Sequence, residues 1–321
     1  RNILTQMSSK IVRFLLSLKS VLFINYFILF KKLFNRKLKI IFFYFPVKVY
    51  QDNILDLVNE IKKDKNIEVI LGYNLVSANE IKSLEKTFFI NPGYLKFLKY
   101  IDIFLSSYVV YDFPKSLNKI YINHDIYDTP MVNIENEQNL INNLIKCNYI
   151  FLSSEISISA LQAKIDQYTD KIKVNKKPKL INTGYLKLDH VHKQINKEKF
   201  KEDSILLAPT LSSMFKEYNL DEFLDKIIKE LLDNNDFKII YRPHPGDKIN
   251  RQKSLVIKNI FEKYQHNERF SLDNNVSYLD SYKRSKILIT DFSGTAYTYA
   301  FSKLRPIIFS SKNENKLIKS S

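Results

Sequence analysis

From Leu38 onward, short apolar runs alternate with longer amphipathic runs, and this alternation limits the possible folds more than any other feature. Short runs rich in Ile, Phe and Tyr are typical of strands, whereas amphipathic runs with a helical period are typical of helices. The first series predicts strands at Ile40–Phe45, Ile67–Leu71, Phe88–Ile90, Ile103–Val110, Lys119–Asn123, Tyr149–Ser153 and Leu180–Thr183. Strands and helices that alternate along a chain build parallel sheets covered by helices, so the sequence predicts an α/β fold.

The helices expected between these strands show the periodicity of one buried face. In residues 53–63, aliphatic side chains recur at positions i, i+3, i+4 and i+7, which are Ile54, Leu57, Val58 and Ile61. Helices are also predicted at Gln138–Cys147 and Ile156–Ile165. We therefore expect one Rossmann-like domain over residues 38–185.

A second series of the same kind begins at Ser204–Ala208. It predicts a helix over Asp221–Leu232 and further strands at Lys238–Tyr241, Lys286–Thr290 and Pro306–Phe309. The lysine-rich stretch Lys187–Lys201 between the two series is the predicted linker, and the length of 321 residues fits two domains. We expect a second Rossmann-like domain over residues 186–321, truncated because the chain ends soon after Phe309 without a long C-terminal helix.

Two Rossmann-like domains of similar size that face a central cleft describe the GT-B architecture of nucleotide-sugar transferases. In such sheets, nucleotides bind at the carboxyl ends of the strands. The sequence contains neither the G-x-G-x-x-G pattern of dinucleotide-binding proteins nor the G-x-x-x-x-G-K-[ST] pattern of P-loop proteins. A dinucleotide-dependent dehydrogenase and a P-loop nucleotidase are therefore not expected.

The chain carries 50 Lys and Arg against 34 Asp and Glu, a formal net charge of +16. This excess favours anionic partners such as nucleic acid, anionic lipid or phosphorylated substrates, although a compositional bias toward Lys, Asn and Ile would produce it as well. A nucleic-acid-binding protein would gather basic residues and exposed aromatics into a stripe. Here the basic residues are spread along the chain and the aromatics lie mainly in predicted strands. A nucleic-acid partner is therefore not expected.

Residues 1–37 form a basic, amphipathic segment that we expect to be helical. Its longest apolar stretch, Val21–Phe30, is interrupted by Asn25 and is too short to span a membrane. Basic residues flank this stretch at Lys19, Lys31, Lys32, Arg36 and Lys37. The segment is therefore expected either to lie in the interface of an anionic membrane or to pack on the first domain, and not to cross the bilayer.

Two turns that follow strands of the second domain carry the candidate chemistry. The first, Tyr241–Asp247, reads Tyr-Arg-Pro-His-Pro-Gly-Asp, and its prolines hold His244 in a fixed, non-helical turn where it can bind a phosphate together with Arg242. The second turn, Thr290–Thr295, leads into a predicted helix. Its small residues and the free N–H groups at the helix N-terminus make an anion site of Ser293, Gly294 and Thr295.

Both turns also have a purely structural explanation. Asp291 or Ser293 before a helix is an N-cap with no ligand present, and a histidine between prolines can be a structural turn residue. A carboxylate next to a phosphate would be repulsive. Asp291 is therefore expected to hold a donor group or a sugar hydroxyl.

The order of these motifs resembles one enzyme family. The segments Ala208–Thr210, Tyr241–Pro245, Ile289–Ser293 and Arg305–Phe309 resemble the C-terminal half of CDP-glycerol glycerophosphotransferases, the teichoic-acid-polymerase-like group, and Asn182–Asp189 is similar to the T-G-Y-P-R-x-D segment ahead of that half. The resemblance implies a GT-B transferase that moves a glycerol-phosphate or glycosyl group from a nucleotide-diphosphate donor to a surface-polymer or lipid-linked acceptor. No cofactor and no metal are expected. A chain with a single cysteine fits a reducing, cytoplasmic setting, and the basic N-terminal segment places it at the inner face of the cell membrane.

The resemblance also assigns residue roles. The family places a catalytic-base histidine in an H-G-T-P motif after a first-domain strand, and the candidate here is His124, with Asp125 in the place of the glycine. A histidine at that position can titrate near neutrality and accept a hydroxyl proton, and Asp125 or Asp128 can orient its ring. In the second domain, His244 is expected to bind the donor pyrophosphate. The donor-binding residues expected beside it are Arg242, Thr210, Asp291, Ser293, Gly294 and Thr295.

The motif at 291–298 departs from the family pattern D-Y-S-S-x-x-F-D. Gly294 replaces the second serine and Thr298 replaces the second aspartate. A UDP-sugar-dependent glycosyltransferase or a 2-epimerase on the same scaffold is therefore an alternative.

The remaining candidate residues are weaker. His190 and His192 are two residues apart, which does not place two ligands on one helical face, and His266 lies in a polar loop, so no metal site is expected. The single cysteine, Cys147, cannot form an intramolecular disulfide and is expected to be buried and inert.

Overall fold

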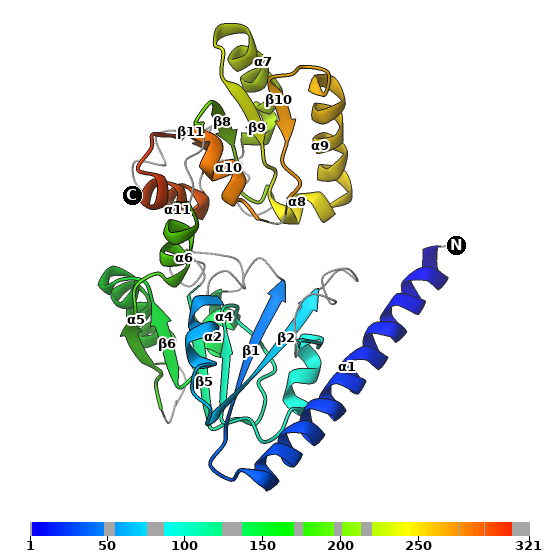
Figure 1. Cartoon of the computed structure of the whole chain (residues 1–321), viewed down its shortest axis with the longest axis vertical. Coiled ribbons are helices and arrows are strands. Elements are labelled where there is room, and N and C mark those ends of the chain that lie inside the picture. Colours follow the sequence, from blue (N-terminus) through cyan, green and yellow to red (C-terminus); the bar gives the residue numbers. More distant parts are fainter. Residues whose placement is uncertain are drawn as a thin grey trace. The chain divides into compact units, whose positions relative to one another are not determined.

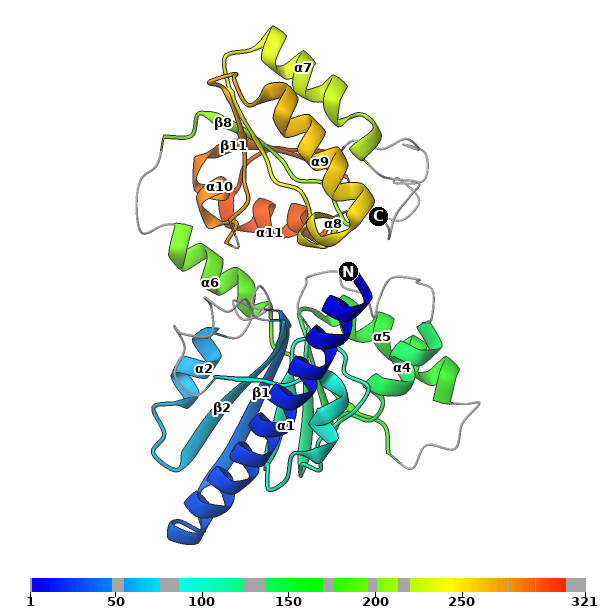
Figure 2. The ribbon, with the colours of Figure 1, turned by 90° about the vertical axis from the view of Figure 1, so that its right-hand side faces the viewer.

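The computed structural model describes residues 2–47, 55–75, 87–123, 137–169, 176–195, 201–212, 220–275, 277–291 and 293–309. The chain divides into two compact units, Arg1–His190 and Val191–Ser321, which we call the first and second unit. Each unit contains a parallel sheet with helices packed against it (Figure 1, Figure 2). The predicted α/β fold is confirmed.

The first unit begins with a long helix and continues with alternating strands and helices. Its elements are α1 Asn2–Phe34, β1 Lys39–Val47, α2 Leu55–Ile61, β2 Ile67–Leu75, β3 Thr87–Phe89, the 3₁₀ helix η2 Pro92–Phe97, β4 Ile103–Ser106, β5 Asn118–Ile122, α4 Glu137–Leu144, β6 Tyr149–Leu152, α5 Glu155–Thr169, β7 Lys179–Asn182 and α6 Leu186–Ile195. Among the described residues, the strand order is β3-β2-β1-β4-β5-β6-β7, and all neighbours are parallel.

Strand β1 shows why the apolar runs form central strands. Neighbouring side chains of a strand point to opposite faces, so a strand covered on both sides must be apolar throughout. Phe42 and Tyr44 lie in one core cluster, and Phe43 and Phe45 lie in another, all fully buried. The uninterrupted apolar run therefore reflects a sheet packed on both faces.

Strand β4 is shorter than the predicted strand Ile103–Val110. It ends at Ser106 because the Ser106 hydroxyl accepts a hydrogen bond from the N–H of Tyr108 at 3.1 Å and lies 2.8 Å from the Tyr108 carbonyl oxygen. A serine that bonds to nearby backbone in this way competes with the strand ladder. The apolar residues Val109 and Val110 that follow are buried in an irregular segment rather than in the sheet.

Helix α1 corrects the expectation that the apolar N-terminal stretch is too short to span a membrane. The helix has 33 residues, and its part Ile11–Phe34 is long and apolar enough to cross a bilayer by length and composition. One face nevertheless packs on the first sheet through Val21, Ile24 and Ile28, which follow a helical spacing (Figure 2). Helix α1 thus packs on the first sheet, which is one of the two arrangements expected from the sequence.

The second unit contains a smaller sheet of the same type. Its elements are β8 Ser204–Leu207, the 3₁₀ helix η4 Leu220–Glu222, α7 Leu224–Asn234, β9 Lys238–Tyr241, α8 Pro245–Ile249, α9 Arg251–Tyr264, β10 Phe270–Leu272, α10 Leu279–Arg284, β11 Ser285–Thr290, α11 Gly294–Lys303 and β12 Ile307–Phe309. Among the described residues, the strand order is β10-β9-β8-β11-β12, again parallel throughout. Helix α6 begins in the first unit and ends in the second, where Val191 and Ile195 are buried in the core. It occupies the first part of the predicted linker.

Candidate active site

The two turns predicted to bind the donor lie at the same edge of the second sheet. Strands β9 and β11 both pair in parallel with β8, which lies between them. Parallel strands that share a neighbour end at one edge, and ligands bind where the strand order reverses, which here is between β8 and β11. The turns after Tyr241 and after Thr290 are therefore on either side of the β8 end, as the sequence predicts.

His244 is held in one orientation by its own turn. It is the N-cap residue of α8, and its Nδ1 accepts a hydrogen bond from the N–H of Gly246 at 3.0 Å. Burial lowers the pKa of His244 below its usual value, and the nearby Arg242 lowers it further against the opposing effect of Asp247. The ring is therefore neutral at neutral pH, with its proton on Nε2, and this N–H is a hydrogen-bond donor.

Arg242 is engaged by the chain itself. Its Nη1 donates to Oδ2 of Asp273 at 2.6 Å and to the carbonyl oxygens of Asn275 and Ser277 at 3.0 and 3.3 Å. The two charged side chains are only 10% and 6% exposed. Burial by itself would raise the pKa of Asp273, but the hydrogen bond from Ser281 and the charge of Arg242 outweigh it and hold the pKa below its usual value. The arginine predicted as a phosphate ligand thus forms a buried ion pair that anchors the chain after β10.

Asp291 is fully buried at the end of β11. One carboxylate oxygen accepts from the N–H of Thr210 at 2.7 Å and the other from the N–H of Leu220 at 3.0 Å. Thr210 follows β8 and Leu220 begins η4, so the Asp291 carboxylate joins both of these positions to the end of β11. The geometry gives Asp291 and Thr210 a positioning role, and contact of either residue with a donor stays a prediction.

Ser293 is the N-cap of α11, which is the structural explanation weighed for this turn. Its hydroxyl accepts from the N–H of Thr295 at 3.2 Å, and the carbonyl of Thr295 accepts from the Tyr282 hydroxyl at 3.2 Å. Ser293, Gly294 and Thr295 are partly exposed, so the first turn of the helix remains accessible. Capping and anion binding are compatible because the cap uses one N–H of the turn.

Two residues of this edge were missed by the sequence reasoning. Asp247, 4% exposed, accepts from the N–H and the hydroxyl of Ser212 at 3.1 and 2.7 Å. Lys248 donates through Nζ to the carbonyl oxygen of Asp273 at 3.1 Å. Both directly follow the Pro-His-Pro-Gly motif, and their position within the first helical turn after His244 is the signal that could have identified them.

The predicted base belongs to a part of the chain outside the described residues. That part contains His124 and Asp125, with Asp128. The chain is described up to Asn123, which is buried and donates its N–H to the carbonyl oxygen of Phe151 at the carboxyl edge of β5 and β6. The described chain thus leads to that edge directly before His124.

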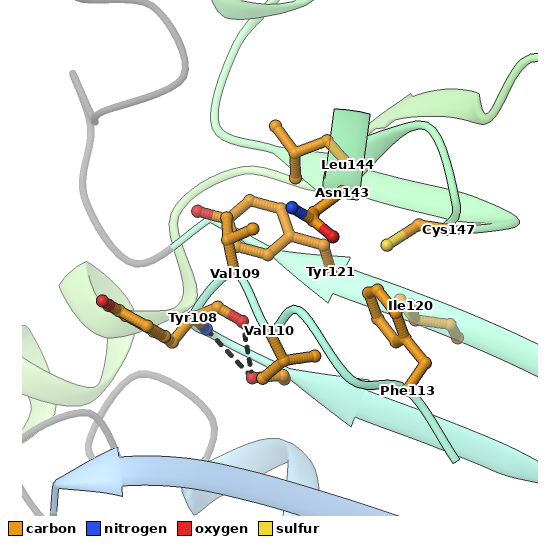
Figure 3. A pocket seen from close by; sticks show the side chains of 10 residues that line it. Tyr108, Val109, Val110, Phe113, Ile120, Tyr121, Asn143, Leu144 and Cys147 are labelled. Carbon is orange, nitrogen blue, oxygen red and sulfur yellow. Dashed lines mark hydrogen bonds between the residues drawn. The ribbon is translucent and has the colours of Figure 1, made fainter. Parts of the chain in front are cut away.

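A hollow beside β4 and β5 is not a ligand site. It is lined mainly by apolar side chains, including Val109, Tyr121 and Leu144 (Figure 3). The space between them has no room for a water molecule. Cys147 lies in its wall, and burial raises the pKa of this thiol to about 12. The thiol is thus protonated at neutral pH, and the prediction that Cys147 is buried is confirmed.

The other histidine candidates form no larger cluster. His190 is buried, and its Nδ1 lies 3.3 Å from Oδ1 of Asp56. In the part of the chain that the structure describes, no group of three or more His, Cys, Asp or Glu side chains could hold a metal ion.

Solved structures share the fold of the chain. The wall teichoic acid polymerase TagF matches with a TM-score of 0.56 at 18% identity, over 89% of this chain and 74% of that one. The UDP-GlcNAc 2-epimerase of Methanocaldococcus jannaschii, solved with UDP-GlcNAc and UDP, matches with a TM-score of 0.59 at 15% identity, over 88% of this chain and 91% of that one. The similarity confirms the predicted GT-B class of fold.

Sequence comparisons identify the family. The minor teichoic acid biosynthesis protein GgaB of Bacillus subtilis (strain 168) is 35% identical over 98 residues, which are 30% of this chain and a tenth (10%) of GgaB. The family model described as CDP-Glycerol:Poly(glycerophosphate) glycerophosphotransferase matches residues 24–317. The match covers most of both units and confirms the resemblance seen in the motifs. The chain therefore belongs to the CDP-glycerol:poly(glycerophosphate) glycerophosphotransferase family, a family of transferases.

Proposed function

We propose that the chain transfers glycerol phosphate from CDP-glycerol to a teichoic-acid-like polymer. The observation that carries the proposal is the hydrogen bond from the N–H of Gly246 to Nδ1 of His244, which leaves Nε2 as the donor nitrogen of the neutral ring. This nitrogen belongs to the sheet edge that also holds the N-terminus of α11. Both groups are donors suited to phosphate oxygens. The family match over residues 24–317 supports the choice of donor.

The chemistry assigned to the second unit is stabilisation of the leaving group. The acceptor hydroxyl oxygen attacks the phosphorus that bears glycerol, the bridging P–O bond breaks, and CMP departs with the electron pair of that bond. His244 and the first turn of α11 supply hydrogen-bond donors for the charge that develops on CMP. Donors fixed before the reaction cost no reorganisation during it, so they are effective in the transition state.

In this proposal, His124 is the general base that accepts the proton of the acceptor hydroxyl. The support is its position in the sequence, directly after Asn123 at the carboxyl edge of the first sheet, together with the family motif. A neutral imidazole accepts a proton near pH 7, and Asp125 or Asp128 would orient it. In this proposal, the predicted domain of residues 38–185 binds the acceptor and that of residues 186–321 binds the nucleotide donor.

We also propose that α1 attaches the protein to the inner face of the cytoplasmic membrane. Along Ile11–Phe34 many large apolar side chains are exposed, among them Leu22 at 62%, Phe23 at 53% and Phe30 at 49%. Apolar surface of this extent marks an interaction site. The helix contains no acidic residue, and its exposed Arg13 and Lys19 suit anionic lipid.

The contacts of α1 with the first sheet favour a helix that lies in the membrane surface. Lys32 forms an ion pair with Asp102 at 2.8 Å, and Asp102 also accepts from the N–H of Ile40 at 2.8 Å. Asn25 bonds to the backbone of Phe97 and Lys99. If α1 crossed the bilayer, these contacts would break, because the first sheet and its polar loops cannot enter the hydrocarbon core together with the helix.

A UDP-sugar donor is the second candidate. Gly294 and Thr298 depart from the family pattern at the sheet edge where the donor is expected, and the fold is shared with UDP-GlcNAc 2-epimerase. The test is CMP release by the purified chain from CDP-glycerol with a glycerol-phosphate oligomer as acceptor, run beside UDP-GlcNAc with the same acceptor. CMP release that depends on the acceptor supports the proposal. Turnover of UDP-GlcNAc alone would replace it by the second candidate.

A further inference from the structure

Lys248 is a half-buried cation whose nearest partner is neutral. It lies in α8, one helical turn beyond His244, and its Nζ donates to the carbonyl oxygen of Asp273 at 3.1 Å. No carboxylate of the described residues lies within ion-pair distance of this amine. Partial burial disfavours the charged form of a lysine, and a nearby anion offsets this effect.

The carboxylates close to Lys248 are already engaged. Asp273 accepts from Nη1 of Arg242 and the hydroxyl of Ser281 on one oxygen and from the N–H of Asn275 on the other. Asp247 accepts two hydrogen bonds from Ser212. The carboxylate of Asp273 is thus paired with Arg242, whereas the amine of Lys248 reaches only the backbone carbonyl oxygen of Asp273.

The electrostatic environment of Lys248 agrees with this arrangement. The pKa of Lys248 is lowered first by burial and then by the charge of Arg242, while Asp273 opposes the shift. The charged form of the lysine is thus destabilised in the unliganded protein. An anion bound beside it would offset that cost, because opposite charges attract strongly where water is partly excluded.

We propose that Lys248, and not Arg242, supplies the cation that binds the diphosphate of the nucleotide donor. The inference rests on the proposed function and adds a residue to the donor site. Arg242 is then a positioning residue, since its guanidinium joins the end of β9 to the chain after β10. Lys248 lies four residues after His244, which is the N-cap of the same short helix.

The experiment is calorimetric titration of the full chain with CDP and with cytidine, which lacks the phosphates. The variants are Lys248→Gln, Lys248→Arg and, as a matched control, Lys258→Gln, which removes an exposed lysine of α9. We expect Lys248→Gln to weaken CDP about tenfold and to leave cytidine unchanged, because only CDP carries the group that the amine binds. Lys248→Arg keeps most of the affinity, and Lys258→Gln keeps all of it.

Equal CDP affinity in the wild type and in Lys248→Gln would overturn the assignment while leaving the proposed function intact. Parallel losses of CDP and cytidine, with a lower unfolding midpoint, would show that Lys248 is structural and would overturn it as well. A wild type that binds neither compound would contradict the proposed function itself, and the assignment with it.

Discussion

The N–H of Gly246 donates to Nδ1 of His244 at 3.0 Å, and this bond places the proton of the neutral imidazole on Nε2. The Gly246 position is crowded, because a Cβ there would meet Leu211 Cδ1 at 2.7 Å and His244 Nδ1 at 3.1 Å. The turn therefore holds the ring closely, and the bond is possible only while Nδ1 is unprotonated.

Protonation of His244 is expected to destabilise the second unit. Its pKa in the folded chain is lowered, so the unfolded chain takes up the proton at a higher pH than the folded one. Stability from this residue is therefore complete above the ordinary histidine pKa of about 6.5 and is lost as pH falls below it. Urea unfolding at several pH values should show this loss of stability. The variant His244→Asn keeps a side chain that can cap the helix, and it should lack the part of the pH dependence that His244 contributes. An unchanged pH profile in the variant would contradict the lowered pKa of His244.

The Arg242–Asp273 pair is expected to be essential for folding. Removing one member leaves the other charge buried, so Arg242→Ala should cost about 3–5 kcal/mol in the free energy of unfolding. Because the pKa of Asp273 is lowered, the stability it contributes is present above the ordinary aspartate pKa of about 3.9 and is lost as pH falls through its folded value. The measurement is urea denaturation, with Lys263→Ala as control because it breaks the exposed pair with Asp225. Similar midpoints for Arg242→Ala and the control would disprove the structural role.

His124→Ala is expected to lower the rate constant for CMP release by about 10²–10⁴-fold, because general-base catalysis acts in the transition state. Binding of CDP should stay nearly unchanged, since the nucleotide is assigned to the other unit. The wild-type pH–rate curve should rise near neutral pH, where the imidazole loses its proton, and the variant should lack this limb. The control is His266→Ala, an exposed histidine. Near-normal turnover in His124→Ala would move the search for the base to Asp125 and Asp128.

The exposed face of α1 is expected to bind anionic vesicles. The double variant Leu22→Glu with Phe30→Glu should reduce co-flotation with phosphatidylglycerol vesicles at least about tenfold, because it places charges in the apolar contact. The matched control is Leu255→Glu with Val256→Glu, on the exposed face of α9. Raised salt should weaken the wild-type interaction, since the basic residues contribute to it.

Two results would contradict the proposed attachment by α1. Equal flotation of both double variants would show that α1 does not face lipid. A dimer that the α1 variant breaks apart, seen by light scattering without vesicles, would make a second copy of the chain the partner of this face.

Much of the architecture follows from local patterns in the sequence. The strand–helix alternation predicted two parallel sheets, and the apolar runs of β1, β8 and β11 form their central strands. The turns after Tyr241 and Thr290 were placed at one edge of a sheet by the same reasoning. These features are predictable because the side-chain period of a strand or helix depends on neighbouring residues along the chain.

The roles of the polar residues at that edge depend on partners far away in the sequence. Arg242 was expected to bind phosphate, but it pairs with Asp273, 31 residues later. Asp291 accepts from Thr210, 81 residues earlier. No local pattern indicates which buried donor will meet which carboxylate, because that choice is made when the strand ends are brought together and each buried charge requires a partner. Local patterns along the chain thus fix the folds of the two units and the positions of their polar turns. Which of those side chains hold the turns in place, and which are left to bind a ligand, depends on long-range contacts made when the chain folds.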